Sequence, residues 1–151
     1  MFEIKDIIQK YDNHAENIAT AICKAREKQI INTTSDLKEI LDGVFPNLSS
    51  GQRYNKLMKV FMALRIAVNN ELIVLDQYLY KTPILDMKED ASMVILTFHS
   101  TEDQIVSNHF KRWTKLKYGK QAFKSVITPT TAELEENPAS RSAKLRVFIR
   151  E

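Results

Sequence analysis

The chain has 151 residues, of which 44% are hydrophobic and 27% are charged, as is typical of a soluble globular protein with room for one full-sized domain. Its three glycines lie far apart and it has one cysteine, which excludes a glycine-rich phosphate loop, an internal disulfide and a thiolate metal cluster. The 22 basic and 19 acidic residues give a net charge of +3, and no apolar run is long enough to span a membrane, so we expect an intracellular protein, in the cytoplasm or, if the source is eukaryotic, in an organelle matrix.

The first fifty residues carry helical signals and no strand signal. Apolar residues recur at helical spacing over 4–11 and over 18–25, and the second pattern ends near Lys28. The polar residues 33–36 are typical of a helix start, and the helix that follows them is ended by Gly43 and Pro46. We therefore predict three short helices, which must pack on one another because isolated helices of this length are marginal in water.

The rest of the chain alternates helical and strand patterns. An amphipathic pattern predicts one long helix over roughly residues 55–80, ended by Pro83. Residues 93–98 form an almost wholly apolar run, which is typical of a strand buried on both faces in a parallel sheet. The remaining predicted elements are a helix from Ser100 with Asp103 at capping-box spacing, a strand over 123–128, a short acidic helix that stops at 137–138, and a strand over 144–150 with one solvent-facing polar side.

This order of elements indicates an α/β fold. Three strands, one of them apolar on both faces, cannot be covered by the helices that this chain supplies. We therefore expect a sequence that is truncated on its N-terminal side.

Residues 98–103 (FHSTED) are the first candidate for a functional site. They place His99, Ser100, Glu102 and Asp103 at the carboxyl end of a predicted strand, where open α/β sheets bind ligands. The alternative is that these residues only cap the next helix. A hydrolase with Ser100 as nucleophile and His99 as base is disfavoured because neighbours on an extended strand point to opposite faces.

The C-terminal third is strongly basic. No acidic residue lies between Asp103 and Glu133, an interval in which cations, including Lys111 and Arg112, alternate with aromatic residues. This pattern suits single-stranded nucleic acid, and it equally suits a solvated basic face with its aromatic residues in the core. The other candidates for binding are Arg65 and Asn69, which share one face of the long predicted helix and could instead border the core, and the basic residues Arg141, Lys144 and Arg146. The three histidines are scattered, so we predict no metal site.

Three segments resemble motifs of one family in the same order. The segment FMALRIAVNNEL at residues 61–72 is similar to the F-Q-A-L-R-I-x-V-N-x-E-L signature of the MraW/RsmH family. Residues 98–106 resemble its F-H-S-L-E-D-R-x-V, and residues 137–146 (NPASRSAKLR) resemble its N-P-R-A-R-S-A-K-L-R. The resemblance extends more weakly over the whole chain. It departs within residues 55–59 and at the following positions: Met62, Thr101, Gln104 and Ala139.

The family consists of S-adenosylmethionine-dependent methyltransferases that act on cytosine N4 of small-subunit (16S) ribosomal RNA. By resemblance, residues 1–54 correspond to the latter part of a helical domain that the family inserts into its Rossmann-like fold, and residues 55–151 to the C-terminal part of the catalytic domain. The donor-binding loop of the family has no counterpart here, so we expect this chain alone not to bind S-adenosylmethionine. The resemblance implies that the following residues contact the acceptor base or the RNA: Arg65, Asn69, His99, Ser100, Glu102, Asp103, Lys111, Arg112, Arg141, Ser142, Lys144 and Arg146.

Three hypotheses follow. The first is the acceptor-side portion of the methyltransferase, which works with a separately encoded N-terminal half or is a fragment of a longer protein. The second is a non-catalytic module that binds ribosomal RNA or its precursor particle during ribosome assembly. The third is a remnant without function. In each case we expect the uncovered strands to drive self-association, most simply as a homodimer.

Overall fold

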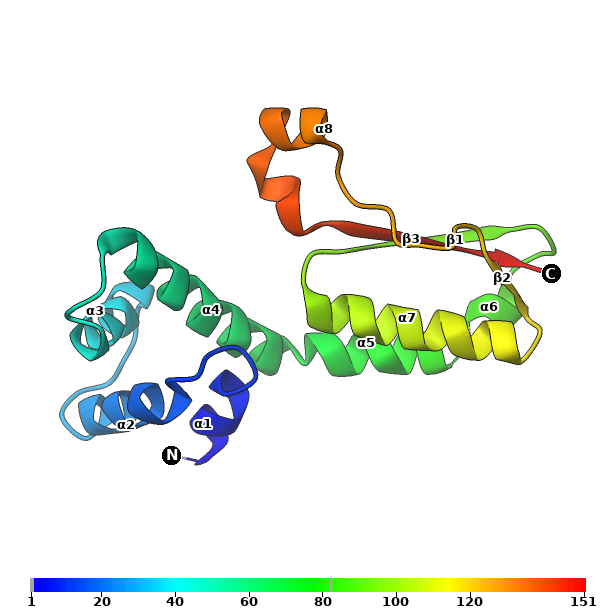
Figure 1. The fold of residues 1–151 in the computed structure, drawn as a ribbon. Coiled ribbons are helices and arrows are strands. Elements are labelled where there is room, and N and C mark those ends of the chain that lie inside the picture. Colours follow the sequence, from blue (N-terminus) through cyan, green and yellow to red (C-terminus); the bar gives the residue numbers. More distant parts are fainter. Residues whose placement is uncertain (1, 82) are drawn as a thin grey trace. The chain divides into compact units, whose positions relative to one another are not determined.

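The computed structural model describes residues 2–81 and 83–151. It divides into two compact units, Met1–Asn70 and Glu71–Glu151, which we call the helical unit and the sheet unit (Figure 1). Each is described by itself.

The helical unit confirms the three short predicted helices. Its elements are α1 (Phe2–Ile8), α2 (Ala15–Arg26), α3 (Thr34–Val44) and α4 (Ser50–Asn69). Thr33 caps α3, because its side chain accepts from the backbone of Asp36 while the Asp36 carboxylate accepts from the backbone N–H of Thr33. The buried core joins all four helices through Ile8, Ile18, Ile22, Leu41, Leu57 and Val60.

The single long helix predicted over residues 55–80 is wrong in two respects. It begins earlier, at Ser50, because Ser49 and Gln52 form a capping box. It is also interrupted at Asn70, whose φ of 52° and ψ of 32° place it in the left-handed region that asparagine tolerates better than most residues. The apolar stripe continues past this one residue, so its spacing carries no sign of the break.

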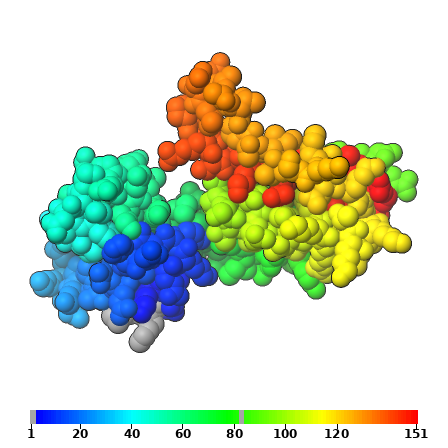
Figure 2. Space-filling view, viewed as in Figure 1, coloured from blue at the N-terminus to red at the C-terminus, as the bar shows by residue number. Residues whose placement is uncertain are grey.

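The sheet unit confirms the predicted α/β class. Its elements are α5 (Glu71–Tyr80), α6 (Pro83–Asp86), β1 (Ser92–Thr97), α7 (Ser100–Lys115), β2 (Gly119–Gln121), α8 (Thr131–Glu136), the 3₁₀ helix η1 (Pro138–Ser142) and β3 (Lys144–Arg150). In Figure 1, α7 lies along one face of the sheet and α5 lies beside α7. Figure 2 shows α8 and η1, in orange, projecting from the sheet.

The three strands are antiparallel, in the order β1-β3-β2, and not parallel as the apolar run at residues 93–98 suggested. Val94 pairs with Val147 and Leu96 with Leu145, which brings four apolar side chains to one face. This face is open: Val94 is 58% and Leu96 51% exposed. The prediction that β1 is buried on both faces is therefore wrong for this chain, because its helices cover one face only.

The polar side of β3 was also predicted to face solvent, and the structure shows the reverse. Arg146 and Phe148 lie on the face that packs against α7, where Phe148 is fully buried against Phe110 and Trp113 of that helix. Leu145 and Val147 lie on the open face. An alternating strand shows which residues share a face, but it does not say which face a neighbouring element covers.

The second strand was predicted over residues 123–128, but β2 pairs with β3 at Gly119–Gln121, and only Ile127 returns to the ladder, opposite Leu145. Gly119 explains this register. Its φ is 152°, and a Cβ atom there would lie 1.9 Å from the carbonyl oxygen of Ile149, so the backbone of β3 can approach only a glycine.

None of the helices in the described ranges, 2–81 and 83–151, is both long enough and apolar enough to cross a membrane.

Candidate functional site

The carboxyl end of β1 leads directly into α7, and His99 is the residue at which the helix is capped. Its Nδ1 accepts a hydrogen bond from the backbone N–H of Glu102 at 3.3 Å. The Glu102 carboxylate accepts in turn from the backbone N–H groups of Phe98 at 3.0 Å and His99 at 3.3 Å. The capping box is thus His99 with Glu102, one residue before the predicted pair of Ser100 and Asp103.

The cap indicates which tautomer a neutral His99 ring adopts. Because Nδ1 accepts the hydrogen bond from Glu102, Nε2 is the nitrogen that bears the hydrogen in that ring. The buried Nε2 lies 3.1 Å from Oε1 of Glu102, in a geometry that makes no hydrogen bond. His99 is therefore held by its neighbours and positions the first turn of α7.

Asp103 joins α7 to β3. Arg146 binds its carboxylate at two points, with Nε at 2.6 Å from Oδ1 and a terminal nitrogen at 3.1 Å from Oδ2. Lys144 Nζ lies 3.3 Å from the same Oδ2. Asp103 is only 8% exposed, and the hydrogen bonds from Arg146 lower its pKa against the effect of desolvation, which would raise it. This cluster is an ionic clamp between helix and strand.

The structure brings together six of the predicted site residues at this end of the sheet: His99, Ser100, Glu102, Asp103, Lys144 and Arg146. Four of them make the capping box and the two-point ion pair, and Lys144 joins the clamp. Ser100 is exposed on the first turn of α7, and Arg141 and Ser142 are exposed on η1, just before β3. Of the predicted site residues near the strand end, these three are exposed to solvent.

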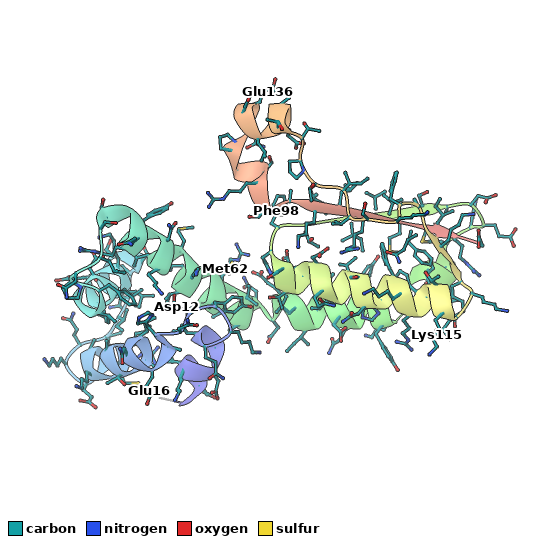
Figure 3. All side chains as sticks on the ribbon, in the orientation of Figure 1. Asp12, Glu16, Met62, Phe98, Lys115 and Glu136 are labelled. Carbon is teal, nitrogen blue, oxygen red and sulfur yellow. The ribbon has the colours of Figure 1, made fainter. Side chains whose placement is uncertain are left out.

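The other predicted residues lie elsewhere. Lys111 and Arg112 lie on α7 but more than two turns further on, about 12 Å along its axis from Asp103. Figure 3 labels Phe98 and Lys115 near the two opposite ends of this helix. Arg65 and Asn69 are exposed residues of α4 and belong to the helical unit.

The aromatic residues between the cations of α7 belong to the core. Phe110 and Trp113 are buried, with ring centroids 5.5 Å apart, so the reading of a basic face over a hydrophobic interior is confirmed for these two. The aromatic residue that contacts a cation of α7 at the surface lies on α5. The Arg112 guanidinium carbon is 4.7 Å from the centroid of the Tyr80 ring. The sequence carries a weak signal for it, because Tyr80 falls outside the stripe of Leu75 and Leu79 that packs on the core.

The open sheet face has a hollow at one side. A depression of about 270 Å³ is lined by Leu96, Ile127, Thr128, Pro129, Glu133, Ala143 and Leu145. Among the described residues, β1 has a strand partner on one side only, so its other edge is free. No residue of β1 is charged and none is proline, although natural edge strands commonly use both to prevent pairing with other chains.

A second ionic cluster, which the sequence did not suggest, lies in the helical unit. The buried carboxylate of Asp12 accepts from Lys56 Nζ at 2.6 Å and from the backbone N–H of His14 at 2.9 Å. Burial would raise the pKa of Asp12, but these hydrogen bonds together lower it. The cluster ties the segment before α2 to α4.

Comparison with known proteins agrees with this architecture. A family model described as the MraW methylase family matches residues 1–151. Two similar relatives are both named "Ribosomal RNA small subunit methyltransferase H". The protein of Sulfurihydrogenibium azorense is 41% identical over 147 residues, which cover 96% of this chain and 50% of the relative. The protein of Persephonella marina is 40% identical over 151 residues, which cover 98% of this chain and 51% of the relative.

The chain thus spans about half the length of the curated relatives it matches. The family match extends over the full length of the chain, through both the helical and the sheet unit. The chain belongs to the MraW methylase family.

Proposed function

We propose that this chain is the acceptor- and RNA-facing portion of an S-adenosylmethionine-dependent methyltransferase that modifies cytosine N4 of 16S ribosomal RNA. The observation that carries the proposal is the match of the whole chain to about half of each methyltransferase relative. The three isolated glycines support it as well, because they leave no segment able to form the glycine-rich donor loop. The donor site then lies in a polypeptide equivalent to the other half of the relatives, and the pair acts in the cytoplasm or an organelle matrix.

Under this proposal, residues 1–54 are the latter part of the inserted helical domain and residues 55–151 the C-terminal part of the catalytic domain. The all-helical first unit is in keeping with this correspondence. The two compact units meet at Asn70, whereas the proposed family segments meet at residue 54. The first boundary reflects packing within this structure, so the two do not have to coincide.

The sheet unit offers a docking surface for the missing half. A strand added to the free edge of β1 would pair its unpartnered backbone groups. A covering layer would bury Val94, Leu96, Leu145 and Val147, which are now on the open face. In the absence of that half, a second copy of this chain is the occupant we expect.

The residues at the strand end then divide by role. His99 and Glu102 set the direction of α7, and Asp103 with Arg146 holds α7 on β3. Methyl transfer depends mainly on holding donor carbon and acceptor nitrogen in line, and a rigid strand end serves that purpose. Ser100, Arg141 and Ser142 are exposed beside it and are proposed to contact the RNA, together with Arg65 and Asn69 from α4.

The test is complementation. The chain would be co-expressed with the N-terminal half of the Persephonella marina relative in cells whose own enzyme has been deleted. Mass spectrometry of small-subunit RNA should then show N4-methylcytosine, which neither half produces alone. Co-purification of the two halves without methylation would refute the enzymatic proposal.

A second candidate is a non-catalytic module that binds ribosomal RNA or its precursor particle. It is favoured by the exposed cations Lys111, Arg112 and Arg141 in a chain without a donor loop. Such a module would bind precursor particles with an affinity that falls steeply with salt, because phosphate contacts release counterions. Binding that is indifferent to salt would exclude it.

A further inference from the structure

The seam between α5 and α7 carries an aromatic–cation pair at the surface. Asp76 Oδ1 lies 2.7 Å from Nε2 of the buried His109, and one turn further along α5 the Tyr80 ring stacks under Arg112. Tyr80 is 61% exposed despite this contact. The pair therefore presents an aromatic ring and a guanidinium group side by side at the surface.

The outer face of α7 continues this surface with positive charge. Lys111, Arg112 and Lys115 are exposed over the last turns of the helix, while Val106, Phe110 and Trp113 are buried on its inner face. In Figure 2 this stretch of α7 is the open surface in yellow-green to yellow. Lys120 is not counted with these cations, because its Nζ lies 2.6 Å from the carboxylate of Glu151.

We propose that Tyr80, Lys111, Arg112 and Lys115 form a binding surface for an unpaired stretch of RNA, separate from the strand end where the acceptor base is handled. Unpaired bases stack on aromatic rings and on guanidinium planes, and lysines along the same groove bind the phosphates. A duplex keeps its bases stacked on one another and can use only the cations. The inference rests on the proposed function, because it names where RNA flanking the target base is held.

The charge contribution is tested with the full chain and a fluorescein-labelled single-stranded RNA of mixed sequence. One variant combines Lys111→Gln, Arg112→Gln and Lys115→Gln. The control combines Lys24→Gln, Lys28→Gln and Lys59→Gln, which are exposed in the helical unit and remove the same charge. The first should weaken binding about tenfold or more and reduce the slope of log Kd against log salt by about 2, since each phosphate contact on a single strand contributes about 0.7. Equal losses in both variants would overturn the proposal.

The stacking contribution is tested by Tyr80→Leu, with Tyr54→Leu as a control of equal exposure, since both residues are 61% exposed. Tyr80→Leu should weaken single-strand binding about fivefold or more, while Tyr80→Phe retains it because the ring remains. Emission of Trp113, the only tryptophan, shows whether each variant keeps the core of the sheet unit. The proposal fails if Tyr54→Leu has the same effect, or if duplex RNA of the same sequence binds as tightly as the single strand.

The outcome is separable from that of the complementation test. If the two halves methylate RNA and the triple variant leaves the KM for that RNA unchanged, this surface is refuted and the proposed function stands. If complementation fails while the charge and stacking variants still lose RNA binding, the surface stands and the enzymatic proposal does not.

Discussion

Asp103 shows how one side chain can join two elements of the candidate site. Its carboxylate binds two cations of β3 from the first turn of α7, so it links the start of the helix to the start of that strand. The partner lies 43 positions away in the chain, and no local pattern indicates such a pairing. The motif 98–103 led us to choose this segment as the candidate site, but it could not show that Asp103 pairs with Arg146.

Replacing Asp103 with Asn should reduce the free energy of unfolding of the sheet unit by about 2 kcal/mol, because Arg146 is left half-buried without its counter-charge. The control is Glu151→Gln, which removes an exposed ion pair of the same unit and should change stability little. Urea denaturation followed by Trp113 fluorescence compares them. Similar losses in the two variants would contradict the clamp.

The lowered pKa of Asp103 sets the pH dependence of this clamp. A carboxyl whose pKa is lower in the folded than in the unfolded chain adds stability that is fully present above the unfolded pKa, near 3.8, and lost as pH falls through the folded value. The sheet unit should therefore lose stability in acid below about pH 4. Asp103→Asn should flatten that decline in urea titrations at several pH values, and a decline as steep as that of the unmodified chain would contradict this.

Among the elements, most of the helices were predictable, apart from the break at Asn70, and the strand pairing was not. Apolar spacing and capping residues are local, so α1, α2, α3 and α8 follow from the sequence. The position of β2 depends on a close approach of Gly119 to Ile149, and the face of β1 that is covered depends on where α7 packs. Both are tertiary effects that no run of neighbouring residues carries.

The start of α7 yields a test of its own. His99→Ala should destabilise the sheet unit by about 1 kcal/mol, because the backbone N–H of Glu102 loses its acceptor. His99→Asn supplies a good capping oxygen and should retain most of the stability. Trp113 fluorescence in urea measures both, and equal losses would show that the ring acts through something other than the cap.

The open face of β1 should make the isolated chain associate. Val94→Glu places a charge in the centre of this apolar face and should convert the self-associated chain to a monomer without unfolding it. Gln104→Glu adds the same charge at an exposed position of α7 and should leave the association intact. Size-exclusion chromatography with light scattering measures the molar mass of each variant. A monomeric unmodified chain would contradict the expected self-association.

At the scale of the whole molecule, the chain combines a family match over its full length with only half the length of its relatives. We expect calorimetric titration of S-adenosylmethionine into the chain alone to show no binding. Adding the N-terminal half of a relative should produce binding of S-adenosylmethionine, because we expect that half to supply the donor loop. Micromolar binding by the chain alone, equivalent to about −8 kcal/mol, would contradict the proposed division of the site.

The uncharged edge of β1 also bears on how such a chain can be produced in a cell. An apolar strand without a charge or a proline is a template for stacking of identical strands, the arrangement found in amyloid. Copies whose β1 edge stays uncovered would aggregate into fibres or be degraded by proteases. An uncovered β1 edge should therefore lower the concentration at which this polypeptide stays in solution.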